Sequence, residues 1–285
     1  IGLNVQPFDA LKHDAVGLVA DAQAGLKALD AALGPWTAPA AWRKAAGTLG
    51  RAWTASLAAA TAPANRGLPS DGQVIGAVQR AGHGSDIVVG ASGGLPGELH
   101  KLWQAGAPGG YHLEYGYSCM GYEIAGGLGV KLARPASEVI VMVGDGSYLM
   151  MNSEIATSVM MGQKLIIVVL DNRGFGCINR LQRATGGESF NNLLEHARHE
   201  TMPEIDFAAH ARALGAIGRR VATTAELEAA IAQARKADRT SVIVVETDPY
   251  KTTEAGGHWW DVPVPEVSDR PKVRSARKNY QKAIA

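Results

Sequence analysis

The clearest indication of the fold is the pattern of residues 139–176, VIVMVGDGSYLMMNSEIATSVMMGQKLIIVVLDNRGFG. It contains two apolar runs, residues 139–143 and 165–170, separated by a helical pattern through Ile155 and Val159. Short apolar runs rich in β-branched residues indicate buried strands, and a helix between two of them is typical of a parallel pair. The stretch therefore predicts a strand, a helix and a second, parallel strand.

The same alternation continues from residue 70 onward. Apolar runs predict five strands, at residues 86–90, 138–144, 165–171, 217–221 and 241–247. Helical patterns lie between them, at residues 71–81, 119–133, 206–215 and 224–237. Because the runs are apolar throughout, both faces of the sheet should be covered. The predicted fold class is α/β, with a mostly parallel, doubly wound sheet flanked by helices.

Four segments are expected along the chain. Residues 1–35 carry two short strands, near residues 3–6 and 16–19, and a helix that ends at Gly34. One β–α unit cannot bury both faces of its strands, so its partners should lie in a preceding segment or in another molecule. The remaining segments are a helical linker with an Ala-rich helix at about residues 40–60, the α/β domain and a basic C-terminal tail, at residues 36–68, 69–262 and 263–285.

Composition narrows the class of protein. The net charge is +1 and 46% of the residues are hydrophobic, which supports a sizeable core and gives no reason to expect a nucleic-acid partner. No apolar stretch approaches the roughly 20 residues that span a bilayer, so no membrane partner is expected. The two cysteines, Cys119 and Cys177, do not have the spacing of a disulfide framework. A reducing, cytoplasmic location is expected.

The polar residues of the opening stretch follow the predicted strands. Asp145 comes just after the first strand and Asn172 just after the second, 27 positions later. If the strands are neighbours, both side chains project into one crevice, with Asp145 exposed at the strand end. Two such oxygen ligands suit Mg²⁺, which takes few protein ligands and prefers phosphates and water. Glycine amides and Ser147 could then bind a diphosphate. A Gly-Asp-Gly tripeptide alone also occurs in ordinary turns, where Asp caps the turn.

The wider pattern is more specific. Gly144-Asp145-Gly146, 25 intervening residues, and Asn172 followed two positions on by Gly174 are similar to the cofactor signature of thiamine-diphosphate-dependent enzymes. The segment YGYSCMGYEIAGGLGVKLA resembles the part of that family that holds the aminopyrimidine ring. VADAQAGLKALDAAL resembles the closing β–α unit of the family's middle domain. The resemblance covers nearly the whole chain and makes residues 69–262 the thiamine-diphosphate and Mg²⁺-binding domain.

Residue by residue, the resemblance implies a binding site. Asp145, Asn172 and the carbonyl of Gly174 would bind Mg²⁺. Met120 matches the apolar residue wedged beneath the bent cofactor, although a core methionine is the alternative. The Ser118 carbonyl and the Met120 amide would pair with the pyrimidine. The implied cofactor-binding residues are Ser92, Ser118, Met120, Gly144, Asp145, Gly146, Ser147, Asn172, Gly174 and Cys177.

The strings GASGGLPGELHKLW and DNRGFGCINRLQ also resemble hydrolases of the family that open a cyclic polyol diketone in myo-inositol catabolism, giving 5-deoxyglucuronate. His112 and Glu114 are candidates to contact this polyol, or else satisfied structural residues. Trp259 and Trp260 would either cover the cofactor cleft or anchor the tail. A small-molecule diketone is thus the expected substrate.

The family's activating Glu comes from an N-terminal domain, usually of a partner subunit, and no Glu of this chain stands in a matching motif. The resemblance thus implies a C-terminal half of an enzyme that works with missing N-terminal domains as a homodimer or homotetramer. Two alternatives remain. One is an acetolactate-synthase-like carboligase with the same cofactor residues, and the other is a cofactor-binding module without its own chemistry.

Overall fold

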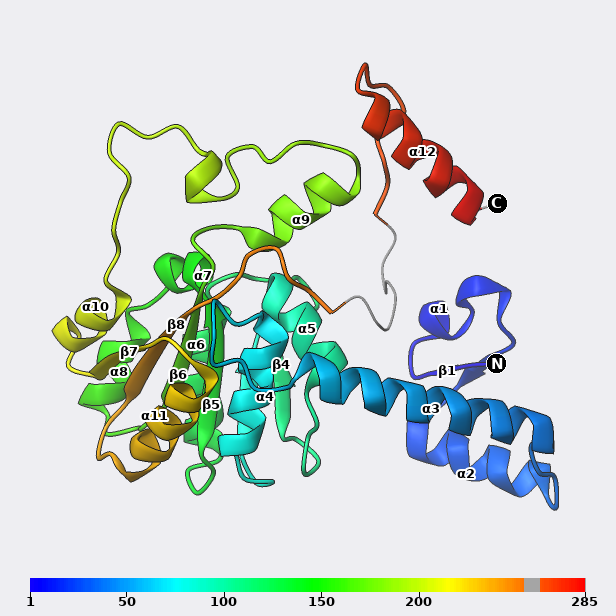
Figure 1. Ribbon diagram of the computed structural model, residues 1–285. Coiled ribbons are helices and arrows are strands. Elements are labelled where there is room, and N and C mark those ends of the chain that lie inside the picture. Colours follow the sequence, from blue (N-terminus) through cyan, green and yellow to red (C-terminus); the bar gives the residue numbers. More distant parts are fainter. Residues whose placement is uncertain (254–261, 285) are drawn as a thin grey trace. The chain divides into compact units, whose positions relative to one another are not determined.

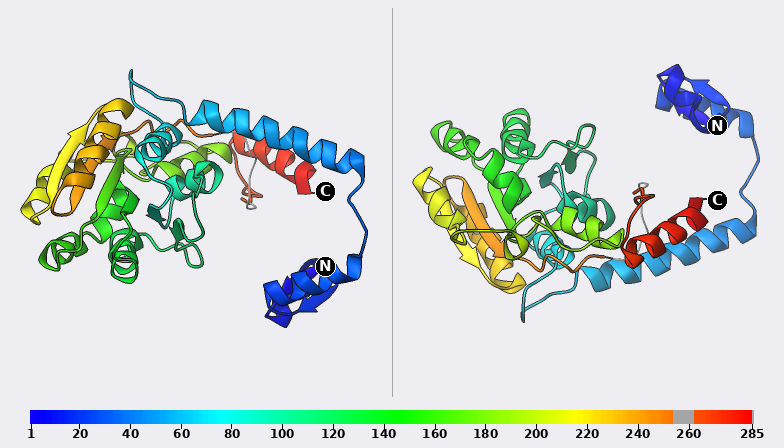
Figure 2. Two further views of the ribbon diagram at one scale, coloured as in Figure 1. Left: turned by 90° about the horizontal axis from the view of Figure 1, so that it is seen from below. Right: turned by 90° about the horizontal axis from the view of Figure 1, so that it is seen from above.

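The computed structural model describes residues 1–253 and 262–284 of the 285-residue chain (Figure 1). The chain divides into two compact units, Ile1–Ala52 and Trp53–Ala285. Figure 2 shows two further views of the chain. Trp259 and Trp260, expected to cover the cleft or anchor the tail, lie outside the described residues.

The first unit is a small parallel β–α arrangement. Its strands β1 (Gly2–Asn4) and β2 (Gly17–Val19) pair in parallel. The helix that follows ends at Gly34, as expected, and Gly34 has a φ of 55°. Asp21 caps its first turn, because its Oδ1 accepts hydrogen bonds from the amides of Gln23 and Ala24 at 3.0 and 3.1 Å. The helical elements here are α1 (Pro7–Ala10), η1 (Lys12–Asp14), α2 (Ala22–Leu33) and the beginning of α3 (Ala40–Ala60).

The second unit is built on a parallel sheet. Its six strands have the order β4-β3-β5-β6-β8-β7, and every neighbouring pair is parallel. All five predicted strands are present. The sixth, β4, has three residues at the sheet edge, too few to show a periodic pattern in the sequence. The strands are β3 (Ile87–Gly90), β4 (Tyr111–Leu113), β5 (Val139–Gly144), β6 (Ile166–Asp171), β7 (Ile217–Val221) and β8 (Ser241–Glu246).

Helices cover both faces of this sheet, which confirms the doubly wound fold (Figures 1 and 2). Alternate residues of β5 serve the two faces: Ile140 and Met142 belong to one buried cluster, and Val141 and Val143 to the other. The first cluster is covered by α4 (Asp71–Ala81), α5 (Gly94–Leu102) and α11 (Thr224–Lys236). The second is covered by α6 (Tyr122–Ala133), α7 (Asp145–Met150), α8 (Glu154–Met160) and α10 (Phe207–Ala213). The other helical elements are α9 (Gly176–Ala184), η2 (Leu194–His196) and α12 (Pro271–Ile284).

Two helices differ from their expected bounds for local reasons. The helix expected from residue 119 begins at Tyr122, because Gly121 has a left-handed φ of 93°. The pattern after Asp145 forms two helices, α7 and α8, which are separated at Met151. There the Asn152 side-chain amide donates to the Tyr148 carbonyl at 3.0 Å, which replaces a backbone bond of a continuous helix.

The strand order determines where a ligand can enter. β3 pairs with β4 on one side and with β5 on the other, so the chain reverses its direction of progress across the sheet between β3 and β5. In open parallel sheets, the loops after the strands diverge at such a point and leave a crevice at the carboxyl ends. A ligand-binding site is therefore expected where the chain leaves β3 and β5. Among the described helices, none is long and apolar enough to cross a membrane.

Candidate functional site

A cleft of about 110 Å³ opens at the carboxyl ends of β3, β5 and β6. It lies where the reversal of the strand order places a crevice. The cofactor residues implied by the resemblance converge there, with the exception of Ser118. Those that line the cleft are Ser92, Met120, Gly144, Asp145, Gly146, Ser147, Asn172, Gly174 and Cys177.

Asp145 is the first residue of α7, directly after β5. Its Oδ2 accepts a hydrogen bond from the Gly174 amide at 2.8 Å, whereas its Oδ1 is buried without a hydrogen-bond partner in the part of the chain that the structure describes. The expectation of an exposed Asp145 is wrong: the side chain is only 6% exposed, because the chain enters α7 at once and the Gly174 loop packs on the carboxylate. Burial raises its pKa to about 7, and the negative charge of Asp171 adds to the shift.

Asn172 supplies a second unpaired oxygen. It follows β6, which pairs with β5 in a register that sets Gly144 opposite Leu170. The predicted adjacency of the two strands is thus confirmed, and both Asp145 and Asn172 line the cleft. Like the Asp145 Oδ1, the Asn172 Oδ1 is buried and has no hydrogen-bond partner among residues 1–253 and 262–284. Buried polar atoms are rarely left unpaired, so two orphan oxygens at neighbouring strand ends fit a hard cation.

This donor set is small. Among the described residues, no group of three or more His, Cys, Asp or Glu side chains could hold a metal ion by itself. A cation held by Asp145, Asn172 and a carbonyl would need further oxygens from a ligand. That requirement matches Mg²⁺, which keeps phosphate and water ligands.

Two glycines of the cleft have no room for a side chain. Gly174 has a φ of 143°, and a Cβ there would lie 2.5 Å from the Asn192 carbonyl oxygen. A Cβ on Gly146 would lie 2.7 Å from the Phe175 ring. The loops can therefore approach each other, and a ligand, through bare backbone.

Ser147 has a partner that the sequence analysis missed. Its Oγ donates to the Glu123 carboxylate, 2.8 Å from Oε1 and 2.7 Å from Oε2, and accepts from the Gly121 amide at 2.6 Å. Glu123 and Ser147 are 1% and 3% exposed. A sequence signal existed, because Glu123 is the only charged residue between Glu114 and Lys131.

The loop before α6 carries Ser118 and Met120. Ser118 has a left-handed φ of 55° and does not line the cleft, but its Oγ donates to Ser92 Oγ at 3.0 Å. The Glu114 carboxylate accepts from the amides of Tyr117 and Cys119 at 3.1 and 2.7 Å. Those bonds hold the pKa of Glu114 below its usual value, and they brace the loop.

His112 is also engaged within the chain. Its Nε2 lies 2.6 Å from the Tyr122 hydroxyl, and the two rings stack with centroids 5.8 Å apart. Both residues line a separate groove of about 820 Å³ beside β4 and α6. Neither His112 nor Glu114 lines the cleft with Asp145, so their contacts favour the structural interpretation over the substrate-binding one.

Two further groups reach the cleft. Asp71, at the start of α4, was not identified from the sequence and is 3% exposed. Burial raises its pKa to about 6, although the Arg180 charge opposes that shift. Cys177 is a free thiol whose pKa is raised by burial.

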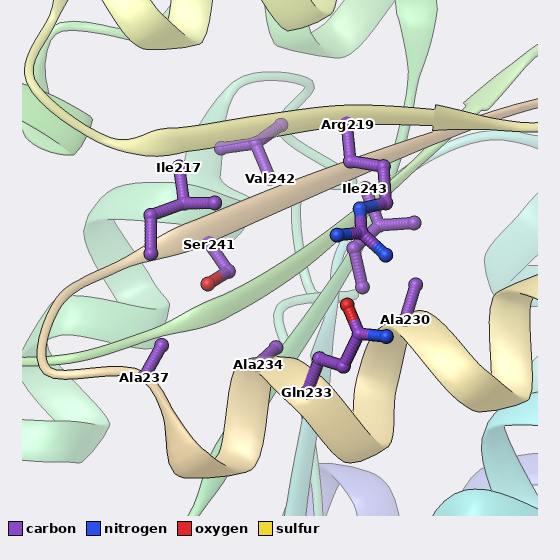
Figure 3. Close-up of a pocket in the computed structure, with 9 residues that line it drawn as sticks. All are labelled: Ile217, Arg219, Ala230, Gln233, Ala234, Ala237, Ser241, Val242 and Ile243. Carbon is purple, nitrogen blue, oxygen red and sulfur yellow. The ribbon is translucent and has the colours of Figure 1, made fainter.

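A third pocket, of about 190 Å³, lies between α11 and the strands β7 and β8 (Figure 3). Ile217 and Ser241, at its rim, are the first residues of those strands. The pocket is therefore near the amino ends of the strands, away from the edge at which parallel sheets bind ligands. Its lining is mostly apolar side chains, with Arg219 and Gln233 beside them.

Comparison with known proteins shows the family to which the chain belongs. The family described as thiamine pyrophosphate enzyme, C-terminal TPP binding domain, matches residues 91–245, more than half of the chain. The matched segment runs from the loop after β3 to the end of β8 and includes all the implied metal ligands. The chain therefore belongs to the thiamine pyrophosphate enzymes and contains their C-terminal cofactor-binding domain.

Curated relatives carry a more particular name. The chain is 41% identical, over 312 residues, to a 3D-(3,5/4)-trihydroxycyclohexane-1,2-dione hydrolase of Geobacillus thermodenitrificans, a match that covers 99% of this chain and 48% of the relative. A protein of the same name from Halalkalibacterium halodurans is 43% identical over 199 residues, which cover 70% of this chain and 31% of the relative. The chain thus spans about half the length, or less, of these relatives.

Solved structures agree on the fold. A thiamine diphosphate-dependent 4-hydroxybenzoylformate decarboxylase of Rhodococcus jostii matches with a TM-score of 0.58 and 22% identity, over 66% of this chain and 34% of that one. A benzoylformate decarboxylase from Polynucleobacter necessarius matches with a TM-score of 0.54 and 21% identity, over 63% and 33% of the two chains. At this level of identity the matches support the architecture alone.

Proposed function

We propose that the cleft binds thiamine diphosphate through Mg²⁺ held by Asp145, Asn172 and the carbonyl of Gly174. The observation that carries this proposal is the pair of buried, unpaired oxygens, Asp145 Oδ1 and Asn172 Oδ1, at the ends of adjacent strands. A cation there would satisfy both oxygens and bridge them to the diphosphate. The remaining implied residues would hold the two ends of the cofactor, with Ser147 at the diphosphate and Met120 beneath the rings.

We further propose that the complete protein hydrolyses a carbon–carbon bond of 3D-(3,5/4)-trihydroxycyclohexane-1,2-dione to give 5-deoxyglucuronate in myo-inositol catabolism. The names of the relatives, at 41% and 43% identity, support this proposal. Thiamine diphosphate supplies a carbon nucleophile and an electron sink for such a cleavage. The protein's part is to bind the cofactor, hold the reacting groups in attack geometry and exclude competing reactions.

The assembly is also a proposal. Because the chain spans 48% of the Geobacillus relative, the group that activates the pyrimidine is assigned to an N-terminal domain, acting within a homodimer or homotetramer. The domain bounds 1–35, 36–68, 69–262 and 263–285 stay predictions. A cytoplasmic location is supported by two free cysteines, Cys119 and Cys177.

A product assay of the complete protein tests this function. The protein is incubated with thiamine diphosphate and Mg²⁺, together with either the cyclic diketone or pyruvate, and the products are followed by mass spectrometry. We expect the ring-opened acid from the diketone. Acetolactate from pyruvate, without ring-opened acid, would favour the carboligase. Cofactor binding with neither product would favour a non-catalytic module.

A further inference from the structure

The buried carboxyl of Glu123 sits behind the hydroxyl assigned to the diphosphate. Glu123 lies in the first turn of α6, and both of its oxygens are within 2.8 Å of Ser147 Oγ. Its Oε2 also accepts from the Gly121 amide at 3.0 Å. The same amide reaches Ser147 Oγ at 2.6 Å, so the three groups form one closed hydrogen-bonded cluster.

The protons of this cluster can be counted. A serine hydroxyl has one proton to donate and two lone pairs. While Glu123 is ionised, its carboxylate only accepts, so it takes the Ser147 proton. Phosphate oxygens of a diphosphate also accept. An ionised Glu123 would therefore leave Ser147 with no proton for the diphosphate, and would place two anions close together in a buried site.

A neutral Glu123 reverses the direction of the bonds. The carboxylic acid donates to Ser147 Oγ, the Gly121 amide occupies the second lone pair, and the hydroxyl proton is free to point into the cleft. Every member of the cluster is then satisfied when a phosphate oxygen accepts from Ser147.

We propose that Glu123 is a positioning residue that binds one proton when the diphosphate enters, and thereby makes Ser147 a hydrogen-bond donor to the cofactor. This inference rests on the proposed function, because it uses the assignment of Ser147 to the diphosphate. Its consequence is that cofactor binding takes up a proton at Glu123 and weakens as the pH rises above the pKa of that group.

The surroundings of Glu123 agree with a neutral state. Burial raises the pKa of Glu123, against the opposing effect of hydrogen bonds from its own amide and from Ser147, Gly121 and Ser92. Of the elements packed on α6, the strands β3 and β5 carry no titratable side chain. The helices beside α6 carry Asp145 and Tyr148 on α7 and Glu154 on α8, and His112 contacts Tyr122. The loop before α6 carries the titratable residues Glu114, Tyr115, Tyr117 and Cys119.

Asp145 also exchanges a proton on binding, because a metal ligand must release its proton, and this release offsets any uptake at Glu123 in the measured count. A comparison of variants removes its contribution. Glu123→Gln presents an amide that donates to Ser147 as the neutral acid would, and it leaves Asp145 in place. Calorimetric titration of the complete protein with thiamine diphosphate at saturating Mg²⁺, in two buffers of different ionisation enthalpy, counts the protons exchanged. We expect the wild type in mildly alkaline buffer to take up more protons per site than Glu123→Gln, by up to about one.

The affinities give a second readout. The wild-type dissociation constant should rise by up to about tenfold per pH unit in alkali, while that of Glu123→Gln rises less steeply. If Glu123→Gln does not fold, Ser147→Ala serves in its place and should also lose the extra proton. Equal proton counts in the wild type and the variants would overturn the role of Glu123 and leave the proposed function standing. A wild-type protein that binds no cofactor would instead refute the proposed function.

Discussion

The Asp145 carboxylate accepts a hydrogen bond from the Gly174 amide at 2.8 Å, across 29 positions of sequence. This bond joins the first residue of α7, directly after β5, to the loop after β6. It uses Oδ2 and leaves Oδ1 buried and without a partner among the described residues. A residue that ties these two segments together and still has one unpaired oxygen has both a structural and a ligand role, and the two can be separated by experiment.

Asp145→Asn is expected to abolish metal-dependent cofactor binding and to leave the fold intact. The amide has the size of the carboxyl, so no cavity forms, but the charge that attracts the cation is lost. We expect the affinity for thiamine diphosphate with Mg²⁺ to fall at least about 100-fold, or about 2.7 kcal/mol. Calorimetric titration measures it, and thermal unfolding checks the fold.

Asp171→Asn is the matched control for this variant. Asp171 is also a 6% exposed carboxylate at a strand end, but it does not line the cofactor cleft. Its variant should keep metal-dependent cofactor binding, with only a small change in affinity, because the Asp171 charge acts on Asp145 without being a ligand. Loss of binding in both variants would show that burial of charge near the strand ends, and not metal ligation, is what the first experiment measures.

Two glycines of α6 test how this helix packs, because replacing them with alanine should change the free energy of unfolding in opposite directions. A Cβ on Gly127 would lie 2.3 Å from the Val141 side chain in the core, so Gly127→Ala is expected to destabilise the protein by about 1–3 kcal/mol. Gly129 is exposed and has open space around the Cβ position. Gly129→Ala should stabilise by about 0.4–1 kcal/mol, because alanine loses less backbone freedom on folding. Denaturant unfolding of both variants measures these changes. If both variants changed the free energy of unfolding in the same direction, the packing of α6 on β5 would be contradicted.

Asp71 should make stability depend on pH. Its pKa is raised from 3.8 to about 6 in the folded protein, so folding favours the protonated form. The stability that it contributes is complete below about pH 4 and is lost as the pH rises through about 6. Relative to Asp71→Asn, the cofactor-free wild type should lose up to about 3 kcal/mol over that window, since one pKa unit is about 1.4 kcal/mol. If the free energies of unfolding of the wild type and of Asp71→Asn differed by the same amount at every pH between about 4 and 8, a raised pKa of Asp71 would be contradicted.

Substitutions of Met120, in the loop before α6, test the side of the cleft opposite Asp145. It is half-buried and lines the cavity, where it is proposed to support the bent cofactor. Met120→Leu conserves volume and should change cofactor affinity little, whereas Met120→Ala removes the support and should weaken it about tenfold. Fluorescence titration with the cofactor separates the two, and equal affinities would return Met120 to an ordinary packing role.

Much of this structure could be predicted because its signals are local. The apolar runs that became β5 and β6 specify both strand identity and, by their separation, a parallel pair. From that pairing, the convergence of Asp145 and Asn172 followed directly. Elements without a periodic signal were missed, such as the three residues of β4 and the glycine-rich start of α5.

The contacts that decide the chemistry could not be predicted in the same way. The burial of Asp145 depends on Gly174, and the role of Glu123 depends on Ser147, 24 positions later. Such contacts arise from the packing of loops on helices, which no residue pattern encodes. For His112 and Glu114 the sequence left a substrate contact and a structural role equally open, and their hydrogen bonds within the chain, which favour the structural role, likewise have no sequence pattern.

The cleft has walls of unequal stiffness. One wall is formed by the ends of β5 and β6, which are held by a largely buried ladder of backbone hydrogen bonds. The opposite wall is the partly exposed loop of residues 114–120, braced largely by side-chain bonds from Glu114 and Ser118. Mutations in the loop can therefore reshape one side of the cavity without moving the oxygens on the other. This separation lets the side of the cleft that is proposed to support the cofactor rings change while the two oxygens proposed to bind the metal stay in place.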